Sequence, residues 1–126
     1  MLPTTLLHRG LLILMLVTGL GSCVTPSIPI PPPAPERMEF QLDLDLGTAT
    51  FAYPATANYS NAIVYVYNRT AGRGVIDTAR ADGSVGPTDP FPAADFDEIS
   101  ISFETDAQVV STCIVLRDGA PGAICN

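Results

Sequence analysis

Hydrophobic and polar residues alternate strictly from Met38 to Leu46. The apolar set is Met38, Phe40, Leu42, Leu44 and Leu46, and a polar or acidic residue follows each of the first four. Successive side chains of a strand point to opposite faces of the sheet, so this period of two predicts a half-buried strand with Leu42 and Leu44 in the core. Ile99, Ile101 and Phe103 alternate with polar residues in the same way, which predicts a second core strand over 96–104.

The rest of the chain after residue 38 predicts further short strands. They are expected at 48–53, 62–67, 75–80, 109–116 and 122–125, between turns rich in glycine, proline, asparagine or aspartate. The segment 62–67 is apolar on both faces, which is typical of a central strand. Together the segments predict an all-β fold, a single small antiparallel β-sandwich of six to seven strands over 38–126.

Two short motifs resemble parts of known bacterial modules. They are Ala81-Asp82-Gly83-Ser84-Val85 and Asp97-Glu98-Ile99-Ser100-Ile101. With the strands around them, they make the stretch 62–116 similar to bacterial Ig-like and carboxypeptidase-regulatory-like modules. The loop 86–95 is longer and richer in proline than is usual there. The resemblance implies a structural, adhesive or spacer domain that is not an enzyme.

The first 22 residues predict a signal peptide. Arg9 precedes an apolar segment from Leu11 to Leu20, about half of the ~20 residues that a membrane-spanning helix needs. The sequence Leu20-Gly21-Ser22-Cys23 resembles the lipobox of bacterial lipoproteins, which implies that Cys23 carries a diacylglycerol and becomes the first residue of the mature protein. An ordinary secretory signal cut near Ser22 or Thr25 and a non-cleaved anchor are the alternatives.

Residues 23–37 are expected to link the anchor to the domain. Six prolines lie between Thr25 and Pro35, and such a run favours an extended polyproline II spacer. A docking site for a proline-binding groove is the alternative. In the lipoproteins that the lipobox resembles, an aspartate directly after the cysteine is the signal for retention in the inner membrane. Val24 occupies this position here, so the outer membrane is favoured.

The cysteines support export. Three cysteines are an odd number, and lipidation of Cys23 leaves Cys113 and Cys125 as a pair in an oxidising compartment. A hairpin centred on Gly119 would place these two cysteines opposite each other, so we predict a disulfide, on the outer face of the sheet because Cys113 alternates with Ile114. Two buried free thiols are the alternative.

The composition excludes several classes of partner and of catalytic site. The 126 residues carry 13 acidic and 6 basic side chains, a net charge of −7, which argues against nucleic acid as a partner. His8, the only histidine, lies in the predicted signal peptide, and there is no lysine. Triads with histidine, Schiff-base lysines and histidine zinc sites are therefore excluded from the mature chain. A hydrolase using acids alone, such as Asp43 and Asp45, is the remaining enzymatic alternative to a solvated strand face.

Two groups of residues could bind a ligand. The acidic cluster Asp89, Asp95, Asp97 and Glu98 lies in one predicted loop and could hold calcium, although its spacing matches no calcium motif and a solvated loop is the simpler interpretation. The tyrosines Tyr53, Tyr59, Tyr65 and Tyr67 could form a carbohydrate or peptide platform, or pack in the sheet.

These observations predict a membrane-anchored lipoprotein of the cell envelope with a non-catalytic β-sandwich. No cofactor is expected, apart from calcium in the alternative of a calcium-stabilised adhesion or carbohydrate-binding module. The expected partners are the lipid bilayer, through acylated Cys23, and an envelope protein or glycan.

Overall fold

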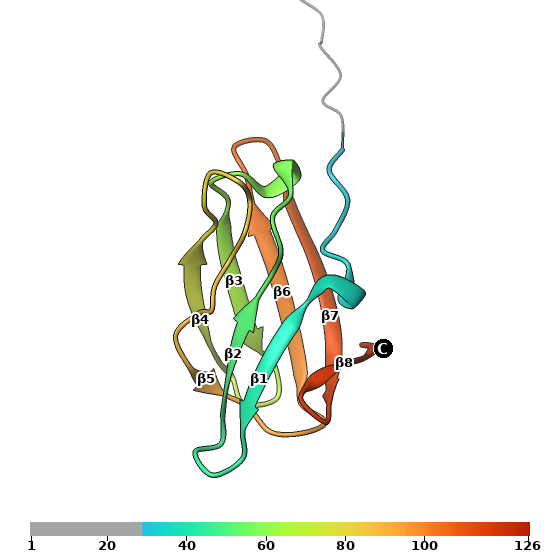
Figure 1. Cartoon of the computed structure of the whole chain (residues 1–126). Helices are drawn as coiled ribbons and strands as arrows, with labels where there is room; N and C mark the ends of the chain where they lie inside the picture. Colours follow the sequence, from blue (N-terminus) through green and yellow to red (C-terminus); the bar gives the residue numbers. More distant parts are fainter. Residues whose placement is uncertain (1–28) are drawn as a thin grey trace, which may run out of the picture.

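The computed structural model describes residues 29–126, which form two antiparallel sheets packed face to face (Figure 1). One sheet has three strands in the order β1-β2-β5, and the other has five in the order β4-β3-β6-β7-β8. The elements are η1 (Pro35–Arg37), β1 (Glu39–Asp43), β2 (Thr48–Ala52), η2 (Ala57–Tyr59), β3 (Ile63–Asn68), β4 (Arg73–Thr78), β5 (Phe91–Pro92), β6 (Glu98–Glu104), β7 (Val109–Arg117) and β8 (Ala120–Ile124). The predicted all-β sandwich is confirmed. The two-residue strand β5 lies in the segment that was expected to be a loop. None of the helices among residues 29–126 is long and apolar enough to cross a membrane.

Side chains from the inner faces of both sheets form the core. In β6, Ile99, Ile101 and Phe103 are fully buried, as their alternation predicts. Tyr59 stacks on Phe103 with 4.0 Å between ring centroids, and the Tyr53 ring meets both of these rings edge-on. The central strand β3 is buried on one face only, because Ile63 and Tyr67 on its other face are exposed.

The first predicted strand is shorter than its pattern suggests. Strand β1 ends at Asp43, and the chain turns through residues 44–47 into β2. The Asp43 carboxylate oxygen Oδ1 accepts the backbone N–H groups of Asp45 and Leu46, and Gly47 takes a positive φ of 64°. Leu44 is 80% exposed and Leu46 74% exposed. The prediction that Leu44 lies in the core is therefore wrong, because local turn chemistry ended the alternation. Leu42 is partly buried against the core.

The described part of the proline-rich segment lies against the sandwich. Pro33 is buried, and its carbonyl oxygen accepts a hydrogen bond from the Thr112 hydroxyl in β7 at 2.6 Å. The Tyr59 hydroxyl donates to the Pro31 carbonyl, and the Ala34 N–H donates to the Tyr53 hydroxyl. The described end of the predicted linker thus contacts the domain through the backbone of residues 30, 31, 33 and 34. The predicted signal peptide 1–22 and Cys23 lie outside the described residues.

Cys113 and Cys125 form the predicted disulfide. Cys113 lies opposite Ser100 on the outward face of the five-stranded sheet, and the Cys125 N–H donates to the Cys113 carbonyl. The turn of this hairpin is Asp118-Gly119, both with positive φ, so Arg117 pairs with Ala120. A hairpin of this register alone would not bring the two cysteines opposite each other. A register shift between Ile114 and Leu116 restores their alignment.

Candidate functional site

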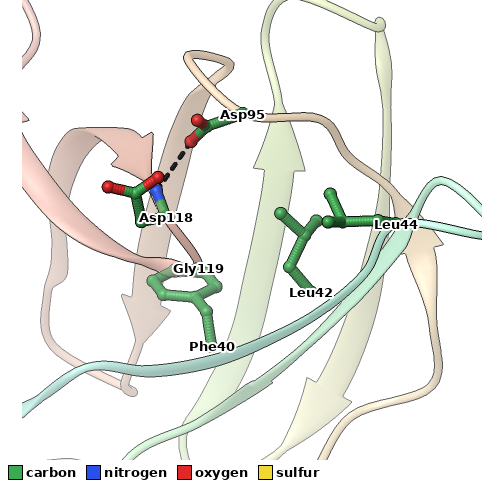
Figure 2. A pocket seen from close by; sticks show the side chains of 6 residues that line it. All are labelled: Phe40, Leu42, Leu44, Asp95, Asp118 and Gly119. Atoms are coloured by element: carbon green, nitrogen blue, oxygen red, sulfur yellow. Dashed lines mark hydrogen bonds between the residues drawn. The ribbon is translucent and has the colours of Figure 1, made fainter.

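A groove of about 470 Å³ opens at one end of the sandwich, between the β1–β2 turn and the β7–β8 turn (Figures 1 and 2). Its apolar side consists of Phe40, Leu42 and Leu44, from β1 and the turn that follows. Its polar side consists of Asp95, Asp118 and Gly119. Segments that are far apart in the sequence therefore meet here, and they combine apolar side chains with carboxylates.

The polar side of the groove is held by backbone hydrogen bonds. The Asp118 N–H donates to Asp95 Oδ1 at 2.7 Å, which joins the loop before β6 to the β7–β8 turn (Figure 2). Phe96, which follows Asp95 in the chain, has a φ of 69° and donates its N–H to the Leu116 carbonyl at 2.7 Å. Its ring is 66% exposed, and the Arg117 guanidinium carbon lies 5.8 Å from the ring centroid. A bulky residue held in this backbone region and exposed to water is typical of a binding surface.

Asn68 anchors the loop behind the groove. It is fully buried at the end of β3, and its side-chain Nδ2 donates to Asp97 Oδ2 at 2.8 Å and to the Pro92 carbonyl at 2.9 Å. Its Oδ1 accepts the N–H groups of Thr70 and Ala71 in the β3–β4 turn. Asn68 thus fixes two loops at once. In the sequence, Asn68 is visible only as the first residue of the predicted turn 68–74, and nothing there indicates its contact with Asp97.

The structure does not gather the four acidic residues into one cluster. Asp97 accepts from Asn68 and from the Ala94 N–H, and Asp95 accepts from Asp118. Glu98 lies 3.9 Å from the Arg69 guanidinium, and Asp89 borders a separate hollow beside β4. Within residues 29–126, no three acidic, histidine or cysteine side chains are grouped as a metal site would require.

The four tyrosines are likewise divided between two places. Tyr53 and Tyr59 are buried in the core, where burial foremost, together with the neighbouring Tyr53, raises the pKa of Tyr59 to about 12. Tyr65 and Tyr67 lie on the outer face of the five-stranded sheet. The Tyr65 hydroxyl donates to a Glu104 carboxylate oxygen at 2.6 Å, which raises the pKa of Tyr65. Only these last two could contribute to a surface platform.

The motif 81–85 has a structural role. Asp82 Oδ1 accepts from the N–H and the hydroxyl of Ser84, and these hydrogen bonds lower the pKa of Asp82. Gly83 has a φ of 83°, and a Cβ there would lie 1.8 Å from the Thr56 carbonyl oxygen. The Asp-Gly pair therefore makes a tight turn against the neighbouring loop, and Val85 then pairs with Tyr53.

Comparisons with known proteins identify no relative of this chain. The chain matches no protein-family model, no curated protein and no solved structure.

Proposed function

We propose that this chain is a lipid-anchored protein of the cell envelope, favouring the outer membrane, whose Ig-like β-sandwich is a non-catalytic interaction module. The groove between the β1–β2 and β7–β8 turns is its binding surface. The observation that carries this proposal is the exposure of large apolar side chains at that end of the domain.

The cysteines support the anchor. Because Cys113 and Cys125 are joined in the disulfide, Cys23 is left as the third cysteine, directly after the apolar segment and the small residues Gly21 and Ser22. Two or three acyl chains hold a protein stably at a membrane, whereas one chain holds it only marginally.

The geometry of the domain supports a binding role for the groove. The described chain begins at residue 29 at one end of the sandwich, and the turn 44–47 lies at the opposite end (Figure 1). Leu44, Leu46 and Phe96 are each more than 60% exposed. An anchor before residue 29 would therefore join the domain at the end opposite to this turn. Apolar side chains on hydrogen-bonded turns are typical of interaction surfaces, because little conformational entropy remains to be lost on binding.

The anchor is tested by the Cys23→Ser variant. We expect the wild-type protein in the membrane fraction, with an intact mass that corresponds to an acylated chain beginning at Cys23. The variant should appear unprocessed or in the soluble fraction. A soluble wild-type protein that begins at another residue would contradict the anchor.

The binding surface is tested by a photo-crosslinking amino acid at position 44, with position 109 as the matched control. Leu44 and Val109 are both more than 60% exposed, but they lie on different parts of the domain. We expect a discrete adduct with an envelope component from position 44 only. Equal labelling from both positions, or none from position 44, would contradict the assigned surface.

A further inference from the structure

Strand β4 is the long free edge of the five-stranded sheet. It pairs with β3 alone and lies at the outer side of the molecule (Figure 1). Among the other outer strands, β8 contains Pro121 and the register shift, β5 has two residues, and β1 is shorter than β4; β1 lies beside β8, as β4 lies beside β5. Of the strands in residues 29–126, β4 is therefore the one best able to accept a further strand.

The register shows which backbone groups of β4 face outward. The Ala79 N–H donates to the Ala62 carbonyl at 2.8 Å, which extends the β3–β4 pairing by one residue. Antiparallel pairs alternate between hydrogen-bonded and non-hydrogen-bonded positions. The odd-numbered residues of β4 therefore bond to β3, and the backbone groups of Gly74, Ile76 and Thr78 point away from it.

This edge is open to solvent. Ile76 is 71% exposed, and a hollow of about 370 Å³ separates the edge from the loop 86–89. The Thr78 N–H is occupied by Asp77 Oδ1 at 2.7 Å. The outward groups of Gly74 and Ile76 remain for a partner strand.

The charges on β4 complement a second copy of the same strand. Arg73 and Asp77 lie two residues to either side of Val75, and neither forms an ion pair within residues 29–126. Antiparallel pairing of two β4 strands about Val75 would place Arg73 of each copy opposite Asp77 of the other. It would also set Ile76 opposite Gly74, which has no side chain. Pairing about Ile76 would instead leave both charges unmatched, so the charges select one register.

We propose that β4 pairs with β4 of a second copy of this chain, in antiparallel register about Val75, and joins the two five-stranded sheets into one. The outward backbone groups of Gly74 and Ile76 supply the hydrogen bonds of this pairing. Val75 then faces its own copy at a non-hydrogen-bonded position, where Cα atoms lie about 4.5 Å apart.

The Val75→Cys variant of the full-length chain tests this register, because two cysteines at this separation can form a disulfide. Under oxidising conditions we expect a reducible dimer on a non-reducing gel. The Ile76→Cys variant is the matched control: its side chain is the more exposed, yet the two copies of position 76 would be offset diagonally by about 7–8 Å, beyond disulfide range. Equal dimer from both variants would show random collision and overturn the proposal.

Charge reversal gives a second test. In the Val75→Cys background, Arg73→Asp or Asp77→Arg alone should lower the dimer yield about fivefold or more, because like charges then face each other. The double exchange Arg73→Asp with Asp77→Arg should restore it. Sedimentation of the same charge series without the Val75→Cys change shows whether pairing depends on the added cysteine. Dimer yields that do not change when the charges are reversed, or a chain that stays monomeric in every variant, would overturn the proposal.

Discussion

Leu116 and Leu44 offer a matched test of the core. Leu116 in β7 is fully buried, whereas Leu44 in the β1–β2 turn is 80% exposed, although the alternation pattern predicts that Leu44 is buried. The change Leu→Ala removes the same atoms at both sites. At Leu116 the substitution keeps the backbone hydrogen bonds to Phe96 and Asp97, because these involve only main-chain atoms. The stability that is lost there therefore comes from side-chain packing.

The expected effects differ severalfold. Truncation of a buried leucine costs about 2–5 kcal/mol, because transfer free energy is lost and a cavity remains. An exposed leucine in a turn should cost less than about 0.5 kcal/mol. A domain of this size has a free energy of unfolding of about 5–15 kcal/mol, so Leu116→Ala should remove a large share of it. Its Tm should fall by about 10 °C or more, while Leu44→Ala should leave Tm almost unchanged.

Urea unfolding followed by far-UV circular dichroism measures both variants, since the chain has no tryptophan to report by fluorescence. The urea midpoint of Leu116→Ala should fall with an unchanged m-value. Similar losses of stability at the two sites would refute the assignment of Leu44 to an exposed turn, and with it the end of β1 at Asp43.

Two further predictions concern groups that the fold brings together. Replacing Cys113 and Cys125 by serine should lower the free energy of unfolding by about 3 kcal/mol, the loop-closure value for a separation of 12 residues; urea midpoints of the reduced and oxidised protein should differ in the same direction, and equal midpoints would contradict it. The pKa of Tyr59 is raised from 10.0 to about 12, so the folded state favours the neutral phenol. The free energy of unfolding should therefore be unaffected by this group below about pH 10 and fall as the pH rises towards 12. In the Tyr59→Phe variant this part of the decline should be absent in urea titrations at each pH, and an identical decline would contradict the assignment.

The disulfide was predicted correctly, but from a hairpin register that differs from the one in the structure. The spacing of Cys113 and Cys125 about Gly119 predicted a symmetric hairpin. The turn is in fact centred between Asp118 and Gly119, and the register shift near Gly122 brings the cysteines opposite each other. A Cβ at Gly122 would lie 2.7 Å from the Val115 carbonyl oxygen, so glycine permits the close backbone approach found there.

The candidate site was only partly visible in the sequence. Asp95 was singled out, but as one of four acidic residues that the structure places apart. Leu44 was noted for the opposite role, as a core residue. Their meeting in one groove depends on where the β7–β8 turn and the loop before β6 end, and neither position follows from local pattern.

Period-two alternation by itself determined the class of the fold and the buried face of β6, because side-chain direction in a strand is a local property of the backbone. The same locality explains the turns at Asp82-Gly83 and Asp118-Gly119. Tertiary structure alone decided which alternating residues are covered, since burial depends on what the opposite sheet provides. It left Leu44 exposed in its turn, and it packed Pro33 against the sandwich by giving its carbonyl a partner in β7.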